Sequence, residues 1–224
     1  AVILARGGSK RIKKKNIKIF HKKPIICWVI EMVSKSGLFD KIIVSTDDKE
    51  IASLAKSNGA EVPFFRPPNL SDDYTNTNDV MSHAVTWMKQ QNWVLDYICC
   101  FYGTSIFFKS SDLIKGLNTI KKGDIPYVFS VTDFNYSIFR SFSILKHGGV
   151  KMFFPEYYEK RSQDLPIAMH DAGQFYWGTP IAWINKEKIF NERASVIKLP
   201  RWAVQDIDDE DDWKRAENIF KYKY

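Results

Sequence analysis

Residues 1–16 read AVILARGGSKRIKKKN, in which a short apolar run breaks into two glycines and a block of positive charge. An apolar run of this length, bounded by glycine, is typical of a buried strand. In an open parallel sheet, a glycine-rich turn after the first strand lets backbone N–H groups approach phosphate oxygens. The opening therefore predicts a strand over 1–5 and, directly after it, a turn that binds an anion.

Charge is concentrated at this end of the chain. Residues 6–23 carry nine basic side chains and no acidic one, whereas the other 24 Lys and Arg face 26 Asp and Glu. The formal net charge of +7 therefore divides into +9 in this stretch and −2 elsewhere. A protein that follows a nucleic-acid backbone usually spreads its basic residues over a face, because affinity comes from many phosphate contacts. The concentration favours a small polyanion over a nucleic-acid partner, with a solvated basic surface as the alternative.

Beyond the opening, short β-rich runs alternate with helical ones, which is the pattern of an α/β protein with a mostly parallel sheet. A length of 224 residues with 45% hydrophobic residues suits one domain, 1–224, with a packed core. The predicted strands are 1–5, 41–46, 61–65, 97–102, 126–131, 175–184 and 195–199, and the predicted helices are 24–36, 48–58, 78–91, 110–122 and 210–222.

The stretch 133–172 breaks this alternation. It is rich in aromatic side chains and carries two glycines at 148–149, so it predicts an inserted arm or hairpin. An insertion this apolar has to be covered, and a second subunit is the expected cover, which predicts a homodimer. The alternative is an insertion that folds back on the core of its own chain.

Three cysteines are present, and two of them are adjacent inside the apolar run DYICCFY. Such cysteines are typical of the reduced core of a cytosolic protein rather than of a disulfide framework, and no metal-type Cys/His spacing occurs. No apolar stretch reaches the roughly 18 residues of a membrane span, and the first residues lack the form of a secretory signal. We therefore expect a cytoplasmic protein without a membrane partner.

The stretch VQDIDDEDDW near the C-terminus is strongly acidic. Asp206 and Asp208 are two residues apart, which in an extended segment puts both carboxylates on one face. Two such carboxylates suit Mg²⁺, which prefers oxygen ligands and usually shares its shell with substrate phosphates. Alternatively, Asp208 or Asp209 caps the predicted helix 210–222. Capping does not account for Asp206, which precedes the cap.

Several motifs, taken in order, resemble one family. They are AVILARGGSK with a following KN, VSTDD at 44–48, NGAEVPFFRP at 58–67, RSQDLP at 161–166, DAGQFYWG at 171–178 and QDID at 205–208. The set covers nearly the whole chain and resembles the cytidylyltransferases that activate sialic-acid-like sugars, the CMP-sialic acid synthetase family. Within it, RSQDLP and HDAGQFYWG resemble the pseudaminic acid branch. The resemblance implies a Rossmann-like three-layer nucleotidyltransferase fold in which 133–172 is a dimerisation arm.

The reaction that this resemblance implies joins CTP to a nine-carbon sugar acid. In the pseudaminic acid branch, the sugar C2 hydroxyl attacks the α-phosphate of Mg²⁺-bound CTP, and the products are CMP-pseudaminic acid and pyrophosphate. The main tasks of such an enzyme are to position the reactants and to neutralise phosphate charge. No His or Glu of the sequence stands out as a general base.

The resemblance also assigns residues to the nucleotide and the metal. Arg6 and Lys10 match positions for the β- and γ-phosphates, and Lys15 matches the position for the α-phosphate. Asn16 and Arg66 are expected at the cytidine end. Asp206 and Asp208 match the Mg²⁺ ligands. The expected nucleotide-binding residues are therefore Arg6, Gly7, Gly8, Ser9, Lys10, Lys15, Asn16 and Arg66, and the expected catalytic residues are Arg6, Lys15, Asp206 and Asp208.

The sugar acid carries a carboxylate, so its pocket should contain a basic residue and several amide or hydroxyl groups. By family position, the expected sugar-binding residues are Tyr102, Thr104, Arg140, Arg161, Gln163, Gln174 and Tyr176. Tyr176 could instead be a core aromatic residue. Arg161 could reach the site of a second subunit across a dimer interface.

Some positions depart from the family pattern. Ile106 stands in GTSIFF where a proline is usual, and Ser137 stands where another is expected. These departures spare the nucleotide and metal positions, so they bear on sugar selectivity rather than on the class of reaction. The alternatives are CMP activation of a sialic or legionaminic acid, and a non-catalytic relative that binds nucleotide.

Overall fold

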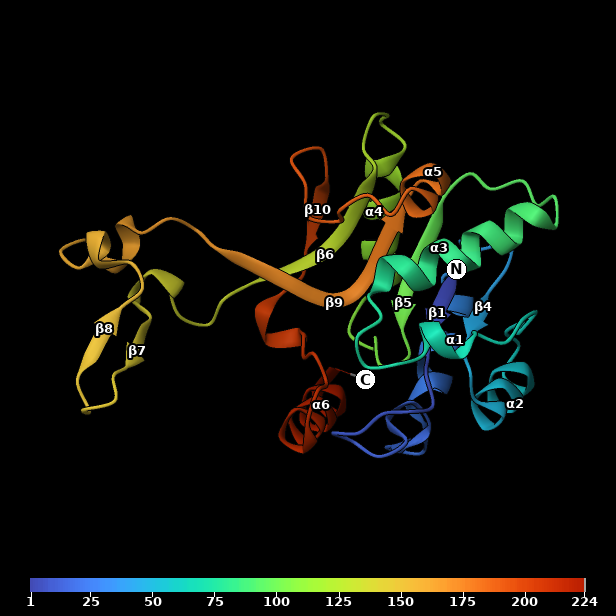
Figure 1. The fold of residues 1–224 in the computed structure, drawn as a ribbon, viewed down its shortest axis with the longest axis horizontal. Helices are drawn as coiled ribbons and strands as arrows, with labels where there is room; N and C mark the ends of the chain where they lie inside the picture. Colours follow the sequence, from blue (N-terminus) through green and yellow to red (C-terminus); the bar gives the residue numbers. More distant parts are fainter. Residues whose placement is uncertain (224) are drawn as a thin grey trace.

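The computed structural model of the protein describes residues 1–223, and the last residue of the predicted domain 1–224 lies outside the described residues. Its centre is a six-stranded sheet in the order β10-β6-β9-β5-β1-β4 (Figure 1). β9 runs antiparallel to β5 and β6, while the other neighbouring pairs are parallel, so the predicted mostly parallel sheet is confirmed. The strands are β1 Val2–Leu4, β4 Ile43–Ser45, β5 Ile98–Tyr102, β6 Tyr127–Asp133, β9 Met169–Gly178 and β10 Ser195–Lys198.

Helices cover both faces of the sheet, because successive strand residues point to opposite sides. Along β5, Cys99 and Phe101 pack in one hydrophobic core, and Ile98 and Cys100 pack in the other. The resulting three layers are those of the expected fold. The first core is covered by α1 Ile25–Lys35, α2 Lys49–Ser57, α4 Ser110–Ile120 and α6 Glu210–Lys223, and the second by α3 Thr77–Gln90 and α5 Pro180–Ile184.

The predicted strand 61–65 is wrong. Glu61 forms an isolated parallel bridge to Ile43, and Phe65 forms another to Thr46, but no continuous strand joins the two bridges. Pro63 lies between them and has no N–H group, so it cannot donate to a continuous ladder along the sheet edge.

The predicted strand 175–184 is wrong in its second half. β9 ends at Gly178, and α5 follows with Thr179 as its N-cap, whose hydroxyl accepts a hydrogen bond from the backbone N–H of Ala182. Pro180 suits the first helical position, because its missing N–H would have no partner within the helix there. β9 also begins earlier than expected, at Met169, which carries the strand out to the base of the insertion.

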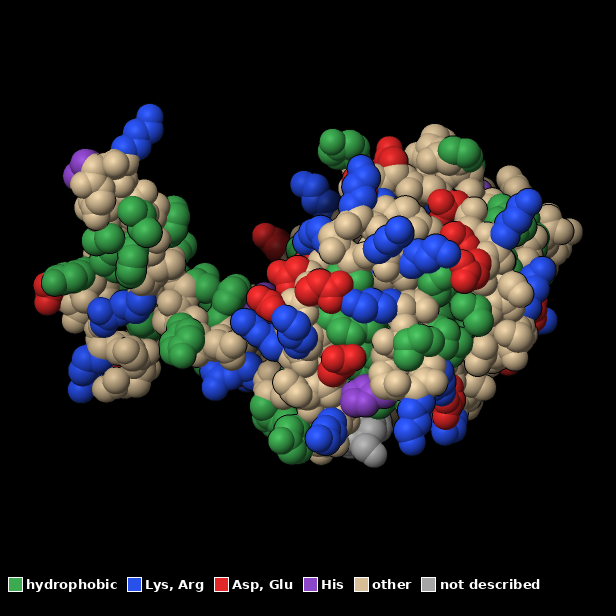
Figure 2. All heavy atoms as spheres, turned by 90° about the horizontal axis from the view of Figure 1, so that it is seen from below, with side chains coloured by type: hydrophobic (Ala, Val, Ile, Leu, Met, Phe, Trp, Pro, Cys, Tyr) green, Lys and Arg blue, Asp and Glu red, His purple; other side chains and the backbone are tan. Residues whose placement is uncertain are grey.

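Residues 134–168 leave the body between β6 and β9 and form a separate lobe, which we call the arm (Figure 1). It holds a hairpin of β7 Phe142–Ile144 and β8 Val150–Met152. Ile144 is 78% exposed and Ile167 is 82% exposed, and Figure 2 shows hydrophobic side chains over the arm, apart from the body. The insertion therefore does not fold back on the core of its own chain.

The remaining regular elements are short. A hairpin of β2 Ile19–Phe20 and β3 Lys23–Pro24 follows the basic opening. No helix within residues 1–223 combines the length and the apolar composition that a membrane crossing needs. The 3-10 helices are η1 Lys15–Ile17, η2 Pro68–Leu70, η3 Ile138–Arg140, η4 Pro155–Tyr157, η5 Ser162–Asp164 and η6 Arg201–Ala203.

Candidate active site

A cavity of about 380 Å³ opens at the carboxyl ends of β1 and β5, where Leu4 pairs with Tyr102. Ligands of open parallel sheets bind at this edge. We call it the central cavity; of the expected site residues, Arg6, Lys15, Asn16, Arg66, Tyr102, Thr104, Tyr176, Asp206 and Asp208 line it. A second space of about 330 Å³, the basic hollow, adjoins it and is lined by Arg6, Ser9, Lys10, Arg11, Lys15, Asn16, Asp73 and Asp208.

In the turn after β1, Gly7 is required for space rather than for an unusual backbone angle. The N–H of Gly7 donates to Asp47 Oδ1 at 2.9 Å, and a Cβ at Gly7 would lie 2.6 Å from Asp48 Oδ2. A Cβ at Gly8 would meet only Arg6 Nη1, at 3.9 Å. The left-handed residue of this loop is Lys14, with φ 52°. Gly7 thus lets the loop pack against the start of α2, and neither glycine lines the central cavity or the basic hollow.

The cations expected at the β- and γ-phosphates are held together by an internal carboxylate. Asp73 Oδ1 lies 2.6 Å from Arg6 Nη1, and Asp73 Oδ2 lies 2.5 Å from Lys10 Nζ. These bonds hold the pKa of Asp73 below its usual value. The structure thus gathers two cations where an incoming phosphate could replace one carboxylate, and phosphate oxygens are strong acceptors for both groups.

Lys15 joins the basic loop to the acidic C-terminal segment. Its ammonium donates to the carbonyl of Ile207 at 2.6 Å and lies 3.8 Å from Asp208 Oδ1. Desolvation by burial lowers the pKa of Lys15, and the charges of Asp208 and Asp206 oppose that shift. A cation that has already lost part of its water shell interacts strongly with an anion placed beside it.

Asp206 and Asp208 flank the buried Ile207 and both line the central cavity. The pKa of Asp206 is raised, first by desolvation and then by the charge of Asp208. The helix cap is Asp209, whose Oδ1 accepts from the backbone N–H groups of Asp211 and Asp212 at 2.9 Å. Capping therefore involves neither of the two expected metal ligands.

The donor set fits a divalent cation that takes further ligands from substrate. Each aspartate offers oxygen atoms, and the like charge that raises the pKa of Asp206 is the charge that a cation would neutralise. Within residues 1–223, no group of three or more His, Cys, Asp and Glu side chains is arranged to hold a metal ion. Mg²⁺ suits such a pair, since it commonly binds through one or two carboxylates, waters and phosphate oxygens.

Asn16 and Arg66, expected at the cytidine end, are both buried in the wall of the central cavity. Asn16 Nδ2 donates to the carbonyl of Arg6 at 2.9 Å, which leaves its amide oxygen as an acceptor. Arg66 donates to Ser45 through Nε (3.1 Å, to Oγ) and Nη2 (2.5 Å, to the carbonyl), and burial lowers its pKa to about 10.

Two tyrosines form the far wall of the central cavity. The hydroxyl of Tyr102 lies 2.8 Å from Thr77 Oγ1, and the hydroxyl of Tyr176 donates to Asp171 Oδ2 at 2.5 Å. Burial is the first cause of the raised pKa of Asp171. Tyr176 is therefore more than a core aromatic residue, because its polar end reaches the cavity together with that carboxylate.

A bulge in β9 brings Asp171 and Tyr176 to the same cavity. Residues five apart on a regular strand face opposite sides of the sheet. Here the pairing with β6 shifts, so that Phe129 faces Tyr176 and Val131 faces Asp171. Gly173 adopts φ 63° within the bulge, a conformation that glycine tolerates best. The hydroxyl of Ser130 holds the bulge by accepting from the N–H groups of residues 174 and 175, each at 3.1 Å.

Comparison with known proteins agrees with this geometry. A family model described as cytidylyltransferase matches residues 1–221. The chain belongs to the cytidylyltransferase family. It is a nucleotidyltransferase, and the alternative of a non-catalytic binding protein is set aside.

Named relatives of this cytidylyltransferase act on different sugar acids. It is 40% identical to the pseudaminic acid cytidylyltransferase of Campylobacter jejuni, over 100% of this chain and 96% of the relative. It is 33% identical to the N-acylneuraminate cytidylyltransferase of Oncorhynchus mykiss, over 100% of this chain and 51% of that relative. A CMP:2-keto-3-deoxy-manno-octonic acid synthetase solved with CTP matches it with a TM-score of 0.71 at 15% identity, over 100% of this chain and 98% of that chain, which shows a shared fold.

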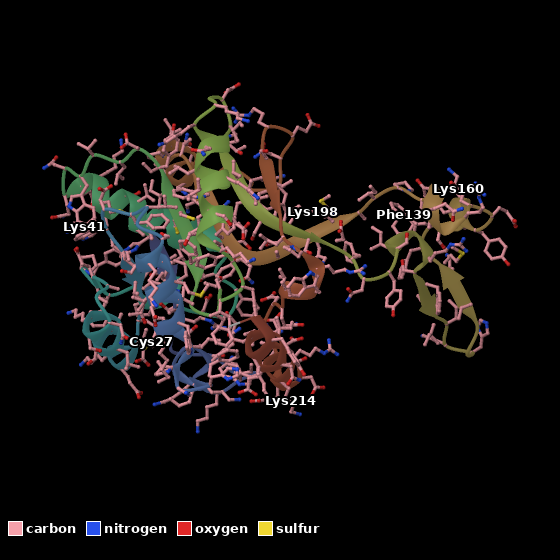
Figure 3. All side chains as sticks on the ribbon, turned by 180° about the vertical axis from the view of Figure 1, so that it is seen from behind. Cys27, Lys41, Phe139, Lys160, Lys198 and Lys214 are labelled. Carbon is pink, nitrogen blue, oxygen red and sulfur yellow. The ribbon has the colours of Figure 1, made fainter. Side chains whose placement is uncertain are left out.

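Four expected sugar-binding residues of the cytidylyltransferase lie away from its central cavity. Gln174 is buried, and both ends of its amide bond the backbone: Oε1 accepts from Phe107 N–H at 2.8 Å, and Nε2 donates to the carbonyl of Ala172 at 2.9 Å. The others, Arg140, Arg161 and Gln163, lie on the arm. Arg140 donates to the carbonyl of Lys160, which Figure 3 shows on the arm, apart from Cys27 in the body.

Sequence reasoning missed Asp73, Thr77 and Asp171 as parts of this site. Asp73 follows Asp72, and nothing in the pair shows that Asp72 bonds its own loop while Asp73 reaches the basic opening. Asp171 begins the motif DAGQFYWG, which is a signal for it, although the bulge that aims it cannot be read from alternation.

Proposed function

We propose that this cytidylyltransferase forms CMP-pseudaminic acid and pyrophosphate from CTP and pseudaminic acid. The observation that carries the proposal is one cavity that joins the cations of the N-terminal loop to the carboxylate pair of the C-terminal segment. The relative in Campylobacter jejuni, matched over its nearly full length, supports pseudaminic acid as the sugar. The enzyme works in the cytoplasm, where CTP is available.

In the proposed reaction, the C2 hydroxyl oxygen of the sugar bonds to the α-phosphorus of CTP. The bond from that phosphorus to the bridging oxygen of pyrophosphate breaks, and the hydroxyl proton passes to water. Arg6 and Lys10 bind the departing phosphates in place of Asp73, and Lys15 faces the charge that develops on the α-phosphate. Asn16 and Arg66 hold the cytidine end.

Asp206 and Asp208 are the residues that would hold Mg²⁺. When bound, the ion supplies charge neutralisation on the phosphates and lowers the pKa of the attacking hydroxyl. The two aspartates lie on the same short segment as Ile207, whose carbonyl holds Lys15, so the segment positions the metal ligands and the cation together.

The test is pyrophosphate release by the purified protein with CTP and Mg²⁺. Pseudaminic acid, N-acetylneuraminic acid and a legionaminic acid are offered separately, and we expect release with the first at least a hundredfold faster than with the others. Preference for a sialic or legionaminic acid would keep the reaction class and overturn the assigned sugar. No release with any of the three, from folded protein, would overturn the proposal as a whole.

We infer that the arm carries a homodimer and delivers Arg140, Arg161 and Gln163 to the partner's central cavity. Within one chain these side chains lie on the arm, and Arg161 Nε donates to its neighbour Asp164 at 2.9 Å. Exposed apolar side chains on the hairpin supply a surface that a second copy can cover. A basic residue from the partner would meet the carboxylate of the sugar acid.

From the exposed arm we predict that the protein is a dimer in solution. We expect light scattering after size exclusion to give twice the chain mass of 26.1 kDa. Ile144→Asp places a charge in the proposed interface, so we expect it to yield monomer and to lower turnover at least tenfold. Val94→Asp is the matched control, because Val94 is 92% exposed on the body. A monomeric wild-type protein would contradict the inference.

A further inference from the structure

Asp171 lies where the central cavity meets two further hollows. One, which we call the side pocket, has a volume of about 530 Å³ and shares Asn76, Thr77, Tyr102, Asp171 and Tyr176 with the central cavity. The other, about 750 Å³, is mostly apolar and also includes Asp171. A ligand that extends from the central cavity into either hollow therefore passes this carboxylate.

The hydrogen bonds of Asp171 leave room for a ligand. Oδ2 accepts from the hydroxyl of Tyr176 at 2.5 Å, and Oδ1 accepts from the N–H of Gly173 at 2.9 Å. An ionised carboxylate has about four acceptor positions, so roughly two remain open. Lys186, which also lines the side pocket, is already paired with Asp79 at 2.7 Å.

The bulge in β9 that directs Asp171 toward the central cavity indicates a role in binding as well as in packing. A half-buried carboxylate is costly unless donors satisfy it, and a regular strand would have turned this side chain to the other face. Instead, the bulge at Gly173 and the hydroxyl of Ser130 hold it toward the cavity. Within the described residues, the hydroxyl of Tyr176 and the N–H of Gly173 donate to this carboxylate, and a ligand can bring further donors of the same kind.

We propose that Asp171 positions the sugar acid by accepting a hydrogen bond from one of its amide N–H or hydroxyl groups, with Tyr176 holding the carboxylate in place. The inference rests on the proposed function. The phosphates of the nucleotide are unsuitable partners, because Asp171 does not line the basic hollow and a carboxylate repels phosphates. A metal role is also unsuitable, because Asp171 forms no three-carboxylate cluster with Asp206 and Asp208 within residues 1–223.

The test is the steady-state kinetics of Asp171→Asn, which keeps the shape but replaces an acceptor-only group with an amide. We expect the KM for the sugar acid to rise 10- to 100-fold, as for a lost hydrogen bond to a charged group. The KM for CTP and the Mg²⁺ concentration for half-maximal rate should stay within about twofold of wild type, since the change lies on the sugar side. Tyr176→Phe, which removes the hydrogen bond that holds the carboxylate, should raise the sugar KM about threefold to tenfold.

Asp133→Asn is the matched control, since Asp133 ends the neighbouring strand β6 and is paired with Lys198 at 2.7 Å. An unchanged sugar KM in Asp171→Asn would overturn the proposal, and so would an equal rise in the KM for CTP. KM does not depend on the fraction of protein that is folded, so partial instability of the variant leaves the result readable. If wild type prefers another nine-carbon acid, the assigned sugar fails, and the same comparison with that acid still decides the role of Asp171.

Discussion

Asp208→Ala is expected to lower the rate of pyrophosphate release about a thousandfold at saturating CTP, sugar acid and Mg²⁺. The carboxylate lines both the central cavity and the basic hollow, and it is one of the two ligands that we propose for the ion. Losing a ligand removes charge neutralisation at the phosphorus as the transition state forms, which is commonly worth several kcal/mol. The measurement is kcat over a range of Mg²⁺ concentrations, and we expect the half-maximal concentration to rise as kcat falls.

The fold should survive this substitution. The side chain of Asp208 bonds Arg11, at 2.8 Å, in a partly exposed ion pair, which typically contributes at most about 1 kcal/mol. Asp211→Ala is the matched control, because Asp211 follows on the same acidic stretch, is exposed, and does not line the central cavity or the basic hollow. We expect it to keep wild-type kinetics. More than a tenth of wild-type activity in Asp208→Ala would overturn the metal assignment.

Local signals were sufficient for most of the sheet and its helices. The errors arose where a missing N–H group or a helix cap, rather than hydrophobicity, determines whether a segment is a strand or a helix. Pro63 interrupts the run 61–65 because it cannot donate, and the pair Thr179 and Pro180 starts a helix inside an apolar run. All three residues are visible in the sequence, so these two errors could have been avoided.

The position of the site was predictable, because a parallel sheet binds its ligands at the carboxyl ends of its strands. Arg6 and Lys15 follow the first strand, and Asp206 lies near the other end of the chain, yet all three line one cavity. The motifs named these residues, and only the topology could show that they meet. Asp73 needed the folded loop, because it differs from Asp72 only in the direction of its side chain.

The sugar end was harder to predict because a bulge changes the register. Alternation places Gln174 on the same side as Tyr176, and on that pattern both would line the pocket. The bulge instead turns Gln174 into the core and brings Asp171 to the cavity. If the proposed sugar site is correct, we expect selectivity for one sugar acid to depend on a few contacts that the regular alternation of the strand does not encode.

Lys15→Met is expected to lower kcat/KM for CTP by 10² to 10³, mostly through kcat. Its ammonium donates to the Ile207 carbonyl and lies 3.8 Å from Asp208 Oδ1. Desolvation lowers its pKa. A cation fixed in place before the reaction begins stabilises the transition state more than bound CTP, because negative charge shifts onto the α-phosphate oxygens and the departing pyrophosphate oxygen as the new bond forms and the old one breaks. Single-turnover measurement of pyrophosphate release separates this loss from slow product release.

Methionine keeps the length of the lysine stem, so the loop should still pack and the cost to stability should be about the 1 kcal/mol of one hydrogen bond. Lys13→Met is the matched control: Lys13 belongs to the same basic stretch but is exposed and does not line the central cavity or the basic hollow. If net charge at this end were what bound the triphosphate, both variants would lose CTP affinity equally. A selective loss of kcat in Lys15→Met shows instead that the position of one cation beside the phosphorus governs the chemistry, and equal losses would contradict that role.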